Sequence, residues 1–334
     1  MQHSKIDKTR MQWIDALKGF GIFCVTFGHL NPWMPLETHI YSFHMCLFFF
    51  ISGYLFTLRT PLLTYVKKKI KNILIPFIAW DLMASMVSII LGDNLKEVLL
   101  KLFVINGDLC WNAPIWFLLI LFIAEILYAL FMYFSNSKKT ILIIIVVSIV
   151  LWILCGNYSF HFKLNILPLA ICFYACGNLF RLSYKNSSLK LTIILLSFLG
   201  VISIIMGNYF NVRISYTDGN FGNIYFCIVA AFAGTLFYVL LFQKCKFFKT
   251  NKMLCAIGKN SLIIMSTQYC FFRVYDLISQ KLFGISIWNY RSTIKALIVS
   301  IITIYFIMLS IVIFKKIFKN NNIILKLSYY IGIR

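Results

Sequence analysis

Apolar residues gather along the chain in about ten long runs, and short polar stretches rich in lysine and arginine separate them. Most runs approach the roughly 20 apolar residues that an α-helix needs to cross a bilayer. The pattern predicts an all-α fold: a polytopic transmembrane helix bundle forming one membrane-embedded domain, residues 1–334, with a short basic cytoplasmic tail at 315–334. We expect about ten spans, at 13–31, 43–58, 73–91, 115–134, 140–156, 166–180, 191–206, 222–242, 257–276 and 293–314.

The distribution of positive charge gives these spans a direction. The connections expected on one side of the membrane carry 22 lysine and arginine residues, against about six on the other. Because short cytoplasmic loops are enriched in these residues, both termini should be cytoplasmic. With 61% hydrophobic and 13% charged residues, the net charge of +22 reflects membrane orientation and contact with membrane lipids. It does not indicate a nucleic-acid partner.

The first apolar segment, 13–31, carries three ionisable residues, Asp15, Lys18 and His29. An α-helix turns once in about 3.6 residues and rises about 1.5 Å per residue, so Lys18 and His29 share one face about 16 Å apart. An ionisable group inside a span costs roughly 2.5 kcal/mol or more unless it faces a polar interior. We therefore expect this face to line a functional cavity. In the alternative, Asp15 and Lys18 only fix the helix in place, with Lys18 reaching toward the cytoplasm.

The second span adds another histidine, His44. The connection at 32–42 is short, so the first two spans should be antiparallel neighbours, with His44 at a depth similar to that of His29. Two neutral imidazoles can handle a proton between them, because each ring accepts at one nitrogen and donates at the other. The alternative is that His44 only donates to a backbone carbonyl.

Two stretches near the N-terminus form a specific pair of motifs: Ile14-Asp-Ala-Leu-Lys-Gly19 with Gly28-His29, and Phe43-His-Met-Cys-Leu-Phe-Phe-Phe-Ile-Ser-Gly-Tyr54. Shorter pieces follow at Ile70–Pro76, Ile115–Leu118, Phe173–Gly177 and Gly258–Leu262. Together, over nearly the full length, they resemble the acyltransferase family 3, the integral-membrane O-acyltransferases of bacterial surface glycans.

The resemblance implies an O-acetyltransferase of the bacterial cytoplasmic membrane. Such an enzyme moves an acetyl group from acetyl-CoA to a sugar hydroxyl of a cell-envelope polysaccharide or a lipid-linked glycan precursor. The family's basic residue and histidine, three turns apart, fall on Lys18 and His29. His29 would be the general base or a transient acyl carrier, and His44 would orient it or share its proton. Two positions depart from the family: Lys18 replaces a frequent arginine, and Gln268 stands where many members have histidine.

Acetyl-CoA, a co-substrate, is the expected donor, and the ten cysteines show no metal-binding spacing. Acetyl-CoA is made in the cytoplasm, and its nucleotide end is a polyanion. This end should therefore dock on a basic cytoplasmic loop, with Lys18 at the mouth of the cavity. The pantetheine arm could then run along the first span toward His29. In the alternative, the basic loop only sets the orientation of the protein in the membrane and contacts lipid headgroups. Its lysines are Lys67, Lys68, Lys69 and Lys71.

Further polar residues are candidates for the cavity wall. Asp15, Asp81 and Glu125 are ionisable groups within expected spans, and Trp116 is either a wall residue or an interfacial anchor. The connection at 92–114 is the longest on the outer side and could form part of an acceptor-sugar platform. Its candidate polar and aromatic residues for this role are Asp93, Glu97, Asp108, Trp111 and Asn112.

The rival function is a transporter or exporter of a small envelope metabolite, for which about ten spans and buried charges are also ordinary. Against it, the charged first span has no counterpart with the same polar pattern in the second half of the chain. Release of CoA from acetyl-CoA by the purified protein would separate the two functions.

Overall fold

The computed structural model describes residues 11–333 except 91, 93, 105–111, 159, 185–188, 217, 290, 323, 325–327, 329 and 330. In this part of the chain the regular structure is helical apart from one isolated bridge between Ser215 and Asn220, so the all-α prediction is confirmed. The helices are α1 (Gln12–Gly28), α2 (Met34–Tyr54), α3 (Leu62–Lys69), a π-helical turn (Ile70–Leu74), α4 (Ile75–Ile90), α5 (Leu95–Val104), a 3₁₀ turn (Ala113–Ile115), α6 (Trp116–Phe134), α7 (Lys138–Cys155), a 3₁₀ segment (His161–Ile166), α8 (Leu167–Ser183), α9 (Leu189–Asn208), α10 (Ile224–Lys244), α11 (Lys246–Lys249), α12 (Lys252–Lys259), α13 (Ser261–Phe283) and α14 (Thr293–Ile317).

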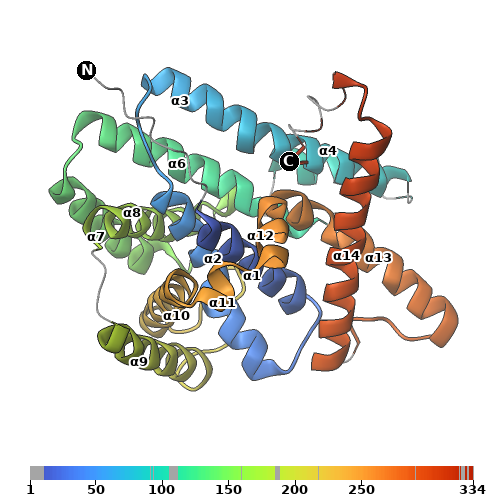
Figure 1. Ribbon diagram of the computed structural model, residues 1–334. Coiled ribbons are helices and arrows are strands. Elements are labelled where there is room, and N and C mark those ends of the chain that lie inside the picture. Colours follow the sequence, from blue (N-terminus) through green and yellow to red (C-terminus); the bar gives the residue numbers. More distant parts are fainter. Residues whose placement is uncertain are drawn as a thin grey trace.

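Helices α1 and α2 lie at the centre of the bundle (Figure 1). α1 contacts α2, α10, α12, α13 and α14, while α2 contacts α6, α8, α9 and α10. α1 is buried on nearly all sides, whereas α7, α9 and α14 are strongly apolar and bury only a small part of their surface. Apolar helices with so much exposed surface are suited to an apolar solvent, so α7, α9 and α14 form the lipid-facing periphery. The polar first segment is thus screened from lipid by the rest of the chain.

Seven helical stretches in the described residues are long and apolar enough to cross a membrane, which makes this a helical membrane bundle. The other three expected spans are also helices, α1, α2 and α13, but α1 has 17 residues and the other two are rich in polar residues. The count of about ten spans therefore stays a prediction. The seven stretches are Leu62–Ile90, Trp116–Phe134, Lys138–Cys155, His161–Ser183, Leu191–Asn208, Ile224–Lys244 and Thr293–Ile317.

The start of the second span was expected at residue 43, and this boundary is wrong. α2 begins at Met34, so most of the expected 32–42 turn is its first two turns. Pro35 lies in the first turn of the helix, where a missing N–H costs nothing. Glu37, in the first turn of α2, is paired with two arginines from distant loops. Sequence reasoning could not pair residues so far apart.

The basic loop expected before the third span is also wrong. Residues 62–90 form one continuous helical stretch, in which Lys67–Lys69 end α3 and Lys71 lies in the π-helical turn. A π-helical turn has one extra residue per turn and often marks a functional site. These lysines therefore have fixed directions on a helix, and only some of them can point to the same place.

Close contact between α1 and α12 brings two distant motifs together. A Cβ atom at Gly19 would overlap the carbonyl oxygen of Leu254, and one at Gly258 would overlap that of Asp15. No side chain larger than hydrogen fits at either position. The two glycines thus let the backbones touch, which places Lys259 beside the start of α1.

The described end of the chain also packs onto the bundle. The indole nitrogen of Trp80 on α4 donates a hydrogen bond to the carbonyl oxygen of Ile331 at 3.0 Å. Gly332 lies against the side chain of Leu262 at the start of α13. Residues 331–333 therefore join α4 to α13 within the tail expected at 315–334.

A buried carboxylate on α2 joins this helix to two connections from the second half of the chain. Glu37 on α2 is fully buried and forms ion pairs with Arg213, between α9 and α10, and with Arg291, between α13 and α14. The guanidinium carbon of Arg213 also lies 4.2 Å from the ring centroid of Tyr41. A buried charge is stable only when it is paired, so both arginines are needed.

We predict that Glu37→Gln lowers the free energy of unfolding by about 2 kcal/mol, because hydrogen bonds to a charged group are lost while both arginines can reach solvent. Thermal unfolding in detergent measures this change. The control is Glu97→Gln, since Glu97 is exposed on α5. Equal unfolding temperatures for the two variants would show that the ion pairs do not stabilise the fold.

Candidate functional site

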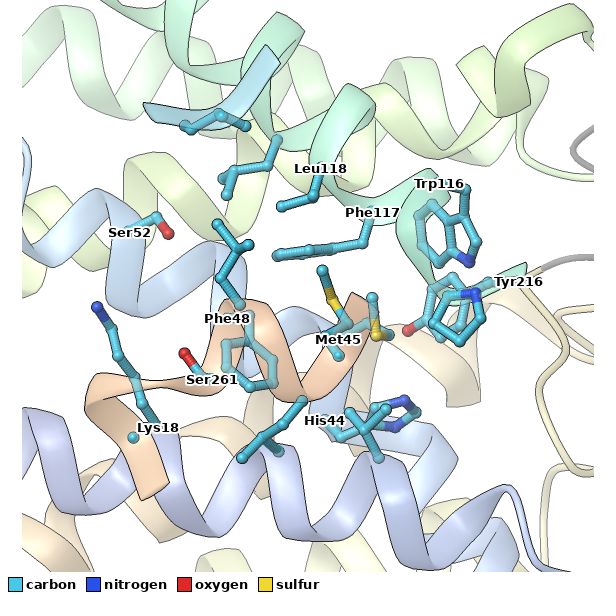
Figure 2. A pocket seen from close by; sticks show the side chains of 18 of the residues that line it. Lys18, His44, Met45, Phe48, Ser52, Trp116, Phe117, Leu118, Tyr216 and Ser261 are labelled. Carbon is cyan, nitrogen blue, oxygen red and sulfur yellow. The ribbon is translucent and has the colours of Figure 1, made fainter. Parts of the chain in front are cut away.

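A continuous cavity of about 590 Å³ runs through the middle of the molecule. Residues of α1, α2, α3, α6, α12 and α13 form its wall, together with the segment between α9 and α10. Figure 2 shows Lys18 toward one end and Trp116 and Tyr216 toward the other, with Phe48, Met45 and Phe117 between them. The cavity therefore has two polar ends and an apolar middle. Its size is typical of a site for a small organic ligand.

The first of these ends, which we name the lysine end, is strongly basic. Lys18 from α1, Lys68 and Lys69 from α3, and Lys259 from α12 all line it. Lys18 and His29 line the same cavity, as the periodicity of the first segment predicted. Lys259 was missed, although it lies in the Gly258–Leu262 motif. The carboxylates of Asp15 and Glu125 offset part of this charge, and the four ammonium groups leave a net positive end that attracts polyanions.

The four lysines of the basic segment 67–71, expected at the donor site together with Lys18, divide into two pairs. Lys68 and Lys69 line the cavity, whereas Lys67 and Lys71 do not. The structure thus brings two of the four loop lysines to the cavity and leaves Lys67 and Lys71 outside its wall.

The three acidic candidates also differ. Glu125 on α6 lines the cavity with a side chain only 3% exposed, and its carboxylate lies 2.6 Å from the ammonium of Lys69. Asp15, buried on α1, lines the cavity as well. Asp81 is buried on α4 but is not part of the cavity wall, so that expectation is wrong. Periodicity placed Asp81 inside the bundle and could not say which side of α4 faces the cavity.

The second end, which we name the histidine end, contains His29 in a defined orientation. Its Nδ1 atom lies 3.0 Å from the hydroxyl of Tyr41 and 3.1 Å from the hydroxyl of Tyr269. Both tyrosine rings meet the imidazole edge to face. When Nδ1–H donates to these oxygens, Nε2 keeps its lone pair and can accept a proton.

His44 lines the same end, and its Nδ1 lies 2.7 Å from the carbonyl oxygen of Ile40. A carbonyl only accepts, so Nδ1 carries the proton and Nε2 keeps a lone pair in the neutral ring. The expected alternative, a bond to the backbone, is thus present together with a place in the cavity wall. The ring of Tyr41 packs against both imidazoles, and no direct hydrogen bond joins the two histidines in the described residues.

Three residues of the histidine end were missed from the sequence: Tyr41, Tyr269 and Arg213. Tyr41 precedes the second motif, so its position there was a usable signal. Tyr269 follows Gln268, the position at which the family often has histidine, and Gln268 itself is fully buried and not part of the cavity wall. Arg213 lies in a connection without any recognised motif.

The expected acceptor platform at 92–114 is described only in part. Asp93, Asp108 and Trp111 lie outside the described residues. Glu97 is exposed and does not line the cavity, and buried Asn112 donates to the carbonyl oxygen of Ser266 at 3.0 Å. Trp116, in contrast, does line the cavity. In the part of the chain that is described, no three His, Cys, Asp or Glu residues are grouped in a way that could hold a metal ion.

Comparison with known proteins gives one result. Residues 11–330 match the model of the family described as Acyltransferase domain, which covers nearly the whole chain. No curated protein and no solved structure matches the chain.

Proposed function

Because the chain belongs to the acyltransferase domain family, we propose that it is a bacterial cytoplasmic-membrane O-acetyltransferase. It moves an acetyl group from acetyl-CoA to a sugar hydroxyl of a cell-envelope polysaccharide or lipid-linked glycan precursor. The observation that supports this proposal is the continuous cavity, which has four lysines at one end and an oriented histidine at the other.

Acetyl-CoA fits the polarity of this cavity from one end to the other. The phosphates of its nucleotide bind at the lysine end, which the charge bias of the loops turns toward the cytoplasm. The uncharged pantetheine arm follows the apolar wall formed by Phe48, Met45 and Phe117. Lys18 and His29 are about 16 Å apart along α1. The arm thus brings the thioester to His29.

At the histidine end, Nε2 of His29 takes the proton from the acceptor hydroxyl while the hydroxyl oxygen attacks the thioester carbonyl carbon. The tetrahedral intermediate collapses, the carbon–sulfur bond breaks, and the proton passes from His29 to the sulfur of the departing CoA. The products are an acetyl ester and CoA with a free thiol. In this mechanism Nδ1–H of His29 donates to the hydroxyl oxygens of Tyr41 and Tyr269, which lie 3.0 and 3.1 Å away, so Nε2 keeps its lone pair. His44 contacts Tyr41 and supports this arrangement.

The experiment that tests this function uses protein purified in detergent and acetyl-CoA, with a thiol reagent to detect released CoA. We expect slow release without an acceptor and faster release with lipid-linked glycans extracted from the source membrane. A transporter would bind or move its solute without cleaving the thioester. Absence of CoA release under both conditions would contradict the proposed function.

The division among the α3 lysines gives a matched pair of variants. Lys68→Gln should raise the KM for acetyl-CoA several-fold, since Lys68 lines the cavity, whereas Lys67→Gln should leave it unchanged. Both residues are exposed on the same helix, so their effects on folding should be similar. The difference should shrink at high salt, because exposed charges are screened beyond about 10 Å at 0.1 M. Equal KM values for the two variants would remove α3 from the donor site.

A further inference from the structure

The segment between α9 and α10, residues 209–223, covers the histidine end of the cavity. Within it, the amide of Ser215 donates to the carbonyl of Asn220 at 2.8 Å, and the amide of Asn220 donates back at 3.0 Å. These two backbone hydrogen bonds close a small hairpin. Arg213, Ser215, Tyr216 and Asp218 of the segment all line the cavity, although no sequence motif marked them.

An aromatic wall joins the hairpin to α6. The ring of Tyr216 is stacked on that of Trp116, with centroids 5.8 Å apart and an angle of 23° between the planes (Figure 2). Tyr216 also meets His44 edge to face at 6.4 Å. The wall therefore begins beside the histidines, where the reacting hydroxyl must arrive.

A carboxylate in a fixed position stands next to this wall. The hydroxyl of Ser215 donates to Oδ2 of Asp218 at 2.5 Å, and the amide of Asp218 donates to the same hydroxyl oxygen at 3.3 Å. Asp218 is otherwise exposed, so its remaining acceptor positions are open to the cavity. Arg213, held by buried Glu37, adds N–H donors on the same segment.

We propose that Trp116 and the hairpin residues Tyr216, Asp218 and Arg213 form the acceptor subsite and bind a hexopyranose ring. This inference rests on the proposed function and adds to it the residues that recognise the acceptor. A pyranose has an apolar C–H face, which packs on an aromatic wall, and an edge of hydroxyls, which donate to a carboxylate and accept from a guanidinium. A ring held in this way presents one of its hydroxyls to the histidine end.

The probes for the test are octyl β-D-glucopyranoside, galactopyranoside, mannopyranoside and N-acetylglucosaminide, each added with acetyl-CoA to the purified full-length protein. The measurements are acceptor-dependent CoA release and mass spectrometry of the acetylated glycoside. We expect at least one glycoside to stimulate release. Asp218→Asn should raise the KM for that glycoside about 10- to 100-fold, the usual effect of losing a hydrogen bond to a charged group.

The same variant should keep the KM for acetyl-CoA, because Asp218 lies at the end of the cavity opposite the lysines that bind the donor. The amide oxygen that the substitution introduces can still accept from the hydroxyl of Ser215, so the hairpin should fold. Trp116→Phe, which keeps an aromatic ring of smaller area, should raise the glycoside KM by a smaller factor. Glu97→Gln is the control, an exposed carboxylate outside the cavity, and should behave as wild type.

Two results would overturn the subsite while leaving the proposed function intact. In the first, the protein releases CoA but no glycoside stimulates it. In the second, a glycoside is acetylated with the same KM by the wild type, Asp218→Asn and Trp116→Phe. A protein that neither binds nor cleaves acetyl-CoA would instead refute the proposed function.

Discussion

Replacing His29 by alanine should lower acyl transfer about 10²- to 10⁴-fold, the contribution of one general base. The effect follows from the position of the imidazole, whose Nδ1 contacts two tyrosine hydroxyls while its ring lines the cavity. Only hydrogen bonds at the cavity wall are lost, so the unfolding temperature should fall little. Transfer is measured as acceptor-dependent CoA release, and stability as thermal unfolding of the same preparation.

A matched control exists in His161, an exposed histidine at the start of a 3₁₀ segment and outside the cavity wall. His161→Ala should keep full activity. If His29→Ala also acetylates glycans at the wild-type rate, the histidine has no part in the chemistry. If its unfolding temperature drops as far as its activity, the residue acts through folding instead.

Replacing Lys18 by alanine should raise the KM for acetyl-CoA strongly and leave kcat at saturating donor nearly unchanged. Lys18 is at the opposite end of the cavity from His29, so it contacts the phosphates in the ground state and the transition state alike. Removal of such uniform binding affects KM, whereas removal of a contact made only in the transition state lowers kcat. Steady-state kinetics with varied acetyl-CoA separates the two effects.

Lys18→Arg is the accompanying variant and should keep much of the activity, because the positive charge is preserved at the mouth of the cavity. An unchanged KM together with a lower kcat in Lys18→Ala would mean that Lys18 lies close to the reacting atoms. The donor orientation proposed above would then be reversed or wrong.

The fold was predictable to the extent that it depends on local pattern. All ten expected spans are helices, because long apolar runs have no other way to satisfy their backbone groups in lipid. The boundaries of α2 and α3 were not predictable. The buried carboxylate of Glu37 in α2 is paired with Arg213 and Arg291, and both arginines come from distant connections.

The same reasoning explains which site residues were found. Lys18 and His29 lie on one helix, so the helical period alone placed them on a common face. Tyr269 and Lys259 reach the cavity only through the packing of α12 and α13 against α1, which depends on Gly19 and Gly258. No local pattern encodes that packing.

Directions around a helix were the main source of error. Lys67 and Lys71 were grouped with Lys68 and Lys69 as one loop, but a continuous helix sends them to different sides. Asp81 is buried as expected, yet outside the cavity wall. In each case the direction of the charged side chain depended on neighbours that only the three-dimensional structure shows.

The most direct test is a structure of the protein with S-acetonyl-CoA, a thioether analogue of acetyl-CoA that cannot be cleaved. We predict that its phosphates lie among Lys18, Lys68 and Lys259, that its arm follows Phe48 and Phe117, and that its carbonyl lies beside Nε2 of His29. A nucleotide bound at the histidine end, or outside the cavity altogether, would contradict the proposed path of the donor and with it the assignment of His29 as the base.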